Sequence, residues 1–156
     1  MEHSIEFLRL QALAPTAERL VLATVLGGLI GWERQLRHKA AGLRTNMLIC
    51  FGSAMFTVLS VQMADKFGGD HMRIAAQIIA GIGFLGAGTI LHSQGSVIGL
   101  TSAATIFVTA SVGMAAGAGL YATAIFATFV VLIALIGLGK LEDYFERRRI
   151  QKSPSA

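Results

Sequence analysis

The residues of this chain that could do chemistry are polar side chains set into long apolar segments. Between residues 43 and 64, polar residues recur at spacings of 4, 3, 4 and 3, which places them on one face of a helix: Asn46, Cys50, Ser53, Thr57 and Ser60. In a later segment, Ser102, Thr105 and Thr109 also share one face. Polar groups at membrane depth are costly to bury, and they commonly serve a function or join helices through hydrogen bonds. We therefore predict that the first stripe faces the interior of a helix bundle.

Two single residues, Gln77 and Glu33, are further candidates. Gln77 lies in an uncharged segment, where its amide either forms a helix–helix hydrogen bond worth about 0.6 kcal/mol or belongs to a functional site. Glu33 is the one acid of a basic loop; Arg34 and Arg44 lie on its side, whereas Arg73 is expected on the opposite side. A solvated surface pair of this kind contributes about 0–1 kcal/mol. For both residues the functional and the structural alternatives stay open.

Enzymatic chemistry finds little support in the sequence. His92 and Ser96 are near neighbours, but no nucleophile motif surrounds them, and the histidines show no paired metal-ligand spacing. The glycine-rich run 81–88 does not follow a strand of a βαβ unit, as a dinucleotide-binding loop would. Because Cys50 is the only cysteine, an internal disulfide, a cysteine-based zinc site and an iron–sulfur cluster are excluded. We predict no catalytic residue, no enzymatic activity and no cofactor, and the sequence defines no set of metal ligands.

The composition indicates a membrane protein. Hydrophobic residues make up 54% of the chain and charged residues only 14%, against about 25% in soluble domains. No Asp, Glu, Lys or Arg occurs from residue 74 to 139, a stretch long enough for about three bilayer crossings with their turns. The formal charge of +4 comes from cations at the ends of apolar runs, which indicates membrane topology and not nucleic-acid binding.

The apolar runs predict an all-α polytopic membrane bundle with about five transmembrane helices. The spans are expected at about 15–33, 43–64, 73–92, 100–116 and 120–139. Residues 1–14 are expected to form an interfacial N-terminal lead, 15–139 the transmembrane domain and 140–156 a charged cytoplasmic tail. The most basic loop, 33–44, belongs in the cytoplasm by the positive-inside rule, so the N-terminus is predicted outside and the C-terminus inside.

The segment 73–92 is predicted to be the central helix of the bundle. It carries four glycines, Gly81, Gly83, Gly86 and Gly88, and small residues let helix backbones approach closely in a bilayer. Ala76, Ala80, Gly83 and Ala87 share one helix face, and Gln77, Gly81 and Gly88 share another. A helix with two smooth faces is expected to pack between neighbouring helices and away from lipid.

A series of short motifs, in order along the chain, carries a family resemblance. They are Gly31-Trp32-Glu33-Arg34, Ala41-Gly42-Leu43-Arg44-Thr45, Arg73-Ile74-Ala75-Ala76-Gln77 with the run 81–88, and Gly99-Leu100-Thr101-Ser102-Ala103-Ala104. Together they resemble the motifs of the MgtC/SapB family over residues 20–138. Asn46 stands where members often have His, Ser102 replaces a Thr, and Phe107 replaces a frequent Trp. The candidate functional residues are Glu33, Arg34, Arg44, Thr45, Asn46, Arg73, Gln77, Thr101 and Ser102.

The resemblance implies a multi-pass protein of the bacterial inner membrane that is linked to magnesium homeostasis. Some members of the family are tied to intracellular survival, and so to virulence, and to restraint of the F-type ATP synthase. The leading hypothesis is therefore a regulator that binds another membrane complex. The alternatives are a small transporter or channel subunit for magnesium or another cation, and a purely structural oligomer. The expected partners are the lipid bilayer and either a membrane protein or further copies of the chain, with no nucleic acid.

Overall fold

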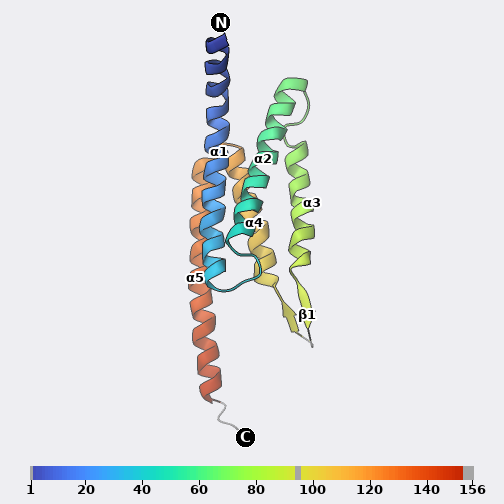
Figure 1. The fold of residues 1–156 in the computed structure, drawn as a ribbon. Coiled ribbons are helices and arrows are strands. Elements are labelled where there is room, and N and C mark those ends of the chain that lie inside the picture. Colours follow the sequence, from blue (N-terminus) through green and yellow to red (C-terminus); the bar gives the residue numbers. More distant parts are fainter. Residues whose placement is uncertain (1, 94–95, 153–156) are drawn as a thin grey trace.

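The structure is a computed structural model that describes residues 2–93 and 96–152, and this part of the chain forms five helices and one small hairpin (Figure 1). The helices are α1 (Glu2–Leu36), α2 (Leu43–Phe67), α3 (Arg73–Gly88), α4 (Leu100–Gly117) and α5 (Tyr121–Lys152). Strands β1 (Leu91–Ser93) and β2 (Ser96–Ile98) pair antiparallel between α3 and α4. Consecutive helices run in opposite directions, so α1 starts at one end of the bundle and α5 finishes at the other (Figure 1).

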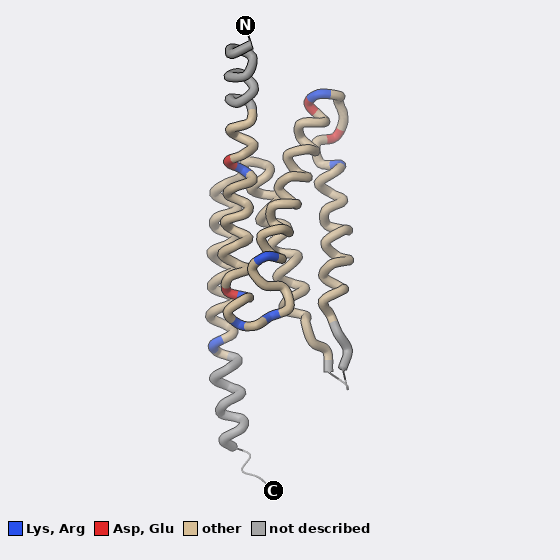
Figure 2. The backbone as a smooth tube through the Cα atoms, viewed as in Figure 1, with Lys and Arg blue, Asp and Glu red and all other residues tan. Residues whose placement is uncertain are grey.

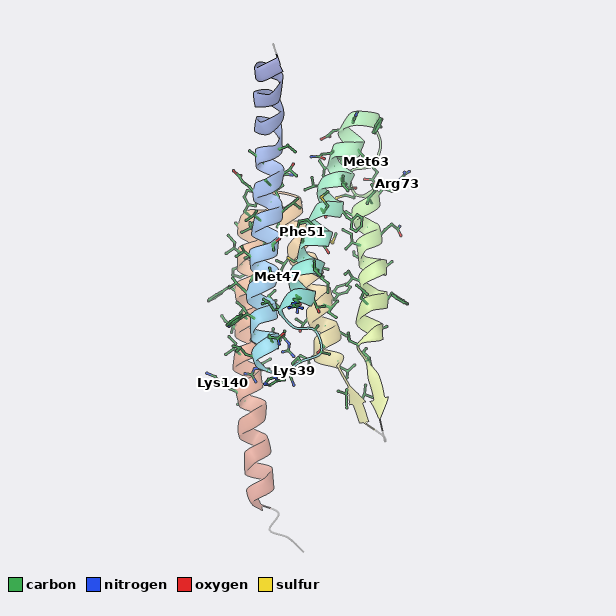
Figure 3. All side chains as sticks on the ribbon, in the orientation of Figure 1. Lys39, Met47, Phe51, Met63, Arg73 and Lys140 are labelled. Atoms are coloured by element: carbon green, nitrogen blue, oxygen red, sulfur yellow. The ribbon has the colours of Figure 1, made fainter. Side chains whose placement is uncertain are left out.

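The predicted all-α membrane bundle is confirmed. Four segments of the described chain are long and apolar enough to cross a membrane: Leu13–Leu36, Leu43–Phe67, Leu100–Gly117 and Tyr121–Leu141. The charged residues gather toward the two ends of these helices (Figure 2), with Lys39 and Lys140 at one end and Arg73 at the other (Figure 3). The orientation of the termini across a membrane stays a prediction.

Helix α3 is shorter than its predicted span, 73–92. Its 16 residues give about 24 Å of helix, against about 30 Å of bilayer hydrocarbon. It ends at Gly88 because Thr89 closes the last turn: the Thr89 hydroxyl donates to the Gly86 carbonyl at 2.8 Å and the Thr89 backbone N–H donates to it at 3.0 Å. The hairpin that follows, in which Leu91 pairs with Ile98, is absent from the sequence prediction.

Helices α1 and α5 extend beyond their predicted spans. α1 begins at Glu2 and continues through Pro15, and α5 runs past residue 139 to Lys152. The segments 2–14 and 140–152 are therefore helical continuations of the neighbouring spans. Their predicted locations, at the outer interface and in the cytoplasm, stay predictions.

Helix α2 approaches α1 at two glycines of α1. A Cβ atom added at Gly27 would lie 2.7 Å from the Asn46 carbonyl oxygen, and one added at Gly31 would lie 2.8 Å from the Leu43 Cα. Both distances are well below the optimum of about 3.5–4.0 Å for non-bonded carbon atoms. The two glycines, four residues apart, therefore let the α1 and α2 backbones meet directly.

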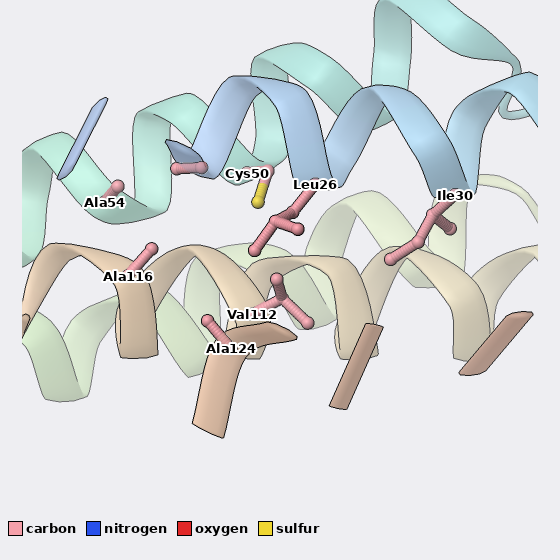
Figure 4. Close-up of a cluster of buried hydrophobic side chains, with 8 residues drawn as sticks. Leu26, Ile30, Cys50, Ala54, Val112, Ala116 and Ala124 are labelled. Atoms are coloured by element: carbon pink, nitrogen blue, oxygen red, sulfur yellow. The ribbon is translucent and has the colours of Figure 1, made fainter. Parts of the chain in front are cut away.

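Helix α4 meets the other side of α2 in the same way. A Cβ atom added at Gly117 would lie 2.5 Å from the Ala54 carbonyl oxygen, and one added at Gly113 would overlap the Cys50 carbonyl oxygen. Gly113 and Gly117 are again four residues apart. Buried apolar side chains form a core cluster around this double contact, as the close-up in Figure 4 shows: Ala23, Leu26, Ile30, Cys50, Ala54, Val112, Ala116 and Ala124.

The prediction that the segment 73–92 forms the central helix is wrong. α4 is central because it contacts each of the other four helices, whereas α3 lies at the edge and packs on α2 and α4 (Figure 1). A Cβ atom added at Gly81, Gly83 or Gly88 would meet no other atom within 4 Å. Gly86 alone of the four glycines faces a neighbour, with Ala103 of α4 3.7 Å away. Small residues at helical spacing predict a helix face without bulky side chains, but they do not predict whether another helix packs against that face.

We expect alanine substitutions to separate the two kinds of glycine. Gly27→Ala and Gly117→Ala force a methyl group into a backbone contact, and overpacking of this kind lowers the free energy of unfolding by about 1–3 kcal/mol. The matched control, Gly83→Ala, adds the same group in open space and should leave stability unchanged or slightly raised. Thermal unfolding in detergent micelles measures the difference. The same unfolding temperature for all three variants would contradict the close contacts at Gly27 and Gly117.

Candidate functional site

The polar stripe of α2 faces the bundle interior, as predicted. Asn46 and Cys50 are completely buried, and Ser53, Thr57 and Ser60 nearly so. The Thr57 hydroxyl donates to the Ser53 carbonyl at 2.8 Å, so it is satisfied within its own helix. The Ser60 hydroxyl instead donates to the His71 carbonyl at 2.5 Å and accepts from the Ile74 N–H at 3.3 Å, which ties α2 to the start of α3.

Asn46 is the centre of a buried hydrogen-bond network. Its Nδ2 donates to the carbonyls of Ala41, at 2.8 Å, and Gly42, at 2.9 Å, and its Oδ1 accepts from the Thr109 hydroxyl at 2.9 Å. One amide therefore holds the α1–α2 loop and joins α2 to α4. A buried group whose donors and acceptor are all engaged stabilises the fold.

Glu33 and Arg34 form a buried charged cluster at the end of α1. Only 7% of Glu33 and 3% of Arg34 is exposed. Arg34 Nη1 lies 3.3 Å from Glu33 Oε2, and Arg37 Nε lies 2.7 Å from Glu33 Oε1. The alternative of a solvated surface pair is therefore wrong, because α1 keeps its last turn inside the bundle.

Two further arginines, one within α1 and one directly after it, donate hydrogen bonds to backbone carbonyls of other helices. Arg19 Nη1 donates to the Gly117 carbonyl of α4 at 3.1 Å, and Arg37 Nη2 donates to the Ile136 carbonyl of α5 at 3.5 Å. Arg19 lies within α1, and Arg37 follows Leu36, the last residue of α1. Neither arginine is among the candidate residues taken from the sequence, because the carbonyls that they reach lie 98 and 99 residues further along the chain.

The remaining candidate residues do not gather into one site. Arg44, Thr45 and Thr101 are exposed, and Ser102 is buried in α4. Arg73 is exposed at the opposite end of the bundle from Lys39 (Figure 3). In the described residues, no group of three His, Cys, Asp or Glu side chains is placed to hold a metal ion.

Gln77 does not turn into the bundle interior, although the face that it shares with Gly81 and Gly88 is predicted to pack between neighbouring helices. It is exposed and lines a groove of about 530 Å³ between α2 and α3, together with Leu48, Phe56, Gly81 and Leu85. Within the part of the chain that the structure describes, its amide makes no hydrogen bond. The helix–helix hydrogen bond that Gln77 was expected to offer is therefore not made within this chain.

The long apolar helices and the buried polar contacts between them define a multi-pass membrane protein. Its family is known: residues 20–144 match the model of the MgtC family, and the chain belongs to that family. This confirms the resemblance carried by the motifs. No solved structure matches the chain.

Relatives from several bacteria share this region. YhiD of Escherichia coli K12, named as a candidate magnesium transporter, is 47% identical over 123 residues, which cover 75% of this chain and 57% of YhiD. Protein MgtC of Brucella abortus is 50% identical over 120 residues, covering 77% of this chain and 50% of that protein. An uncharacterized protein of Haemophilus influenzae is 42% identical over 142 residues, covering 86% of this chain and 59% of that protein. The chain thus spans little more than half the length of these relatives.

We expect Glu33→Gln to destabilise the protein strongly. The substitution removes the carboxylate that faces two arginines, and Arg34 Nε and Nη2 already lack a hydrogen-bond partner among the described residues. Breaking a buried ion pair from one side typically costs about 3–5 kcal/mol. Arg44→Gln, at an exposed cation nearby, is the control and should change stability by less than about 0.5 kcal/mol. Denaturant unfolding in micelles measures the free energy of unfolding. Wild-type values for both variants would contradict a stabilising role of the charged cluster.

Proposed function

We propose that this chain is a magnesium-related protein of the bacterial inner membrane that regulates another membrane protein by binding it. The observation that carries the proposal is the outward face of α3, which we call the small-residue ridge: Ala76, Ala80, Gly83 and Ala87. All four residues are exposed, and a Cβ atom at Gly83 would meet nothing within 4 Å. Faces of small residues promote close contact between membrane helices. The ridge is therefore open to a helix of another protein.

The hydrogen bonds of the buried polar side chains favour binding of a partner protein over conduction of ions. Asn46 is fully engaged with the α1–α2 loop and with Thr109, and the hydroxyl of Thr105 donates to the Thr101 carbonyl of its own helix. Polar groups satisfied in this way join helices, and an ion that used them as ligands would have to displace these hydrogen bonds.

The family and the charge distribution support the remaining parts of the proposal. The magnesium link rests on membership of the MgtC family and on the name of the Escherichia coli relative. The loop between α1 and α2 and the helix ends beside it, residues 33–44, carry four cations and one acid: Arg34, Arg37, Lys39 and Arg44, with Glu33. The positive-inside rule favours a cytoplasmic location for this loop. The F-type ATP synthase is the candidate partner that the family resemblance suggests.

We expect Gly83→Leu to disrupt partner binding without unfolding the protein. The isobutyl group would stand on the ridge and hold a partner helix away, weakening binding by about tenfold or more. Co-precipitation of F-type ATP synthase with the tagged chain in reconstituted bilayers measures this loss. Gly81→Leu, which adds the same group on another face of α3, is the matched control. If the Gly83→Leu variant bound the ATP synthase as strongly as the wild type does, the small-residue ridge would be excluded as the docking surface.

A second candidate function is cation transport, favoured by the name of the Escherichia coli relative and by the unpaired Gln77 amide in the α2–α3 groove. If Gln77 lines a cation path, Gln77→Leu should abolish flux while stability changes little, since one membrane hydrogen bond contributes about 0.6 kcal/mol. Under our proposal, liposomes that contain the wild-type protein should leak magnesium ions and protons no faster than liposomes without protein. Wild-type flux that the substitution abolishes would overturn the regulator proposal.

A further inference from the structure

Two neighbouring hollows lie between α2 and α3. The larger is the α2–α3 groove of about 530 Å³. The smaller, about 160 Å³, lies at the loop that joins the two helices, and Ser60, Asp70 and Arg73 are among its lining residues. Ile74 lines both hollows, so the loop hollow lies next to the end of the groove.

The loop hollow carries opposite charges that do not pair with each other. Arg73 and Asp70 are both exposed, and within the described chain neither side chain forms an ion pair. One Asp70 oxygen accepts the Met72 backbone N–H at 2.9 Å, which fixes the carboxylate and leaves its other oxygen open. A cation and an anion that line the same hollow complement a ligand that carries one charge of each sign.

The side chains change character in a regular order down the groove. Gln77 lies one turn below Arg73, about 6 Å along the helix axis, and its amide has no hydrogen-bond partner within the described chain. Below it the α3 side of the groove is apolar, with Ile78, Gly81 and Leu85. From Arg73 to Leu85 the helix rises about 18 Å, close to the half-thickness of about 15 Å that one bilayer leaflet contributes.

We propose that the α2–α3 groove binds one phospholipid whose headgroup carries a phosphate and a primary ammonium group. The order of groups on α3 matches the order of groups in such a lipid. Arg73 pairs with the phosphate, Asp70 accepts hydrogen bonds from the ammonium, and the Gln77 amide donates to an ester carbonyl. One acyl chain lies along the apolar part of the groove against Gly81, where the missing side chain leaves room.

The lipid groove and the small-residue ridge are separate surfaces of α3. Gly81 lines the groove and Gly83 stands on the ridge, and two residues on an α-helix point about 200° apart around its axis. A Cβ atom at either position would meet no atom within 4 Å, so both glycines have open space where a side chain would begin. The two sites can therefore be tested independently, and either proposal can fail without the other.

Native mass spectrometry of the full chain released from micelles tests the lipid site. The probes are phosphatidylethanolamine and phosphatidylglycerol with identical acyl chains, because the second has the phosphate and lacks the ammonium. We expect one phosphatidylethanolamine to be retained about tenfold more tightly than phosphatidylglycerol. Equal retention of the two lipids would mean that only unspecific boundary lipid is bound, and would overturn the proposal.

Four variants locate the binding. Gly81→Leu fills the groove and should reduce phosphatidylethanolamine retention about tenfold, as should Arg73→Gln, which removes the phosphate partner. Asp70→Asn should abolish the preference for phosphatidylethanolamine over phosphatidylglycerol. Gly83→Leu, the matched control on the ridge, should retain the lipid as the wild type does. Equal retention of phosphatidylethanolamine by Gly81→Leu and Gly83→Leu would exclude the groove as the lipid-binding site. If Gly81→Leu fails to fold, the Arg73 and Asp70 variants still test the proposal, because both residues are exposed.

Discussion

The bundle depends on how closely the backbone of α2 approaches α1 on one side and α4 on the other. Gly27 and Gly113 both meet α2 at Cys50, so a side chain at either glycine would push a helix outward. The hydrogen bond from Thr109 to Asn46, at 2.9 Å, tolerates only a few tenths of an ångström of such movement. The glycines and the buried polar contacts therefore act as one constraint, because the amide can be satisfied only where the helices are that close.

Periodicity in the sequence predicted most of the fold. The positions of α2, α4 and α5 follow from apolar runs, and the burial of the α2 stripe follows from polar residues that recur every three or four positions. The place of α3 could not be predicted in this way. Gly81 and Gly83 resemble Gly27 and Gly31 in their sequence surroundings, yet only the latter pair meets another helix of the chain. A small residue marks a face on which close contact is allowed, and the contact itself depends on tertiary arrangement.

The contacts of the candidate functional residues could be predicted from the sequence less well than the fold. Glu33 was recognised as an ion-pairing acid, but its burial depends on how the last turn of α1 packs in the bundle. Its contact with Arg37 follows the i, i+4 rule for helices and could have been read from the sequence. The carbonyls that Arg19 and Arg37 reach are 98 and 99 residues further along the chain, and no local pattern indicates contacts at that separation.

The double contact of α2 also has a consequence for the order in which the protein assembles during synthesis. Helix α1 precedes α2 and can pair with it as soon as both have entered the membrane. The opposite face of α2 must wait for α4, because Thr109 is 63 residues beyond Asn46. At the usual rates of translation this delay is about 3–12 s, during which the Asn46 side-chain oxygen lacks the hydroxyl that later binds it. Helix α3 is synthesised within this interval, so the newly made chain passes through a stage in which α2 has its close glycine contact with α1 and still lacks the one with α4.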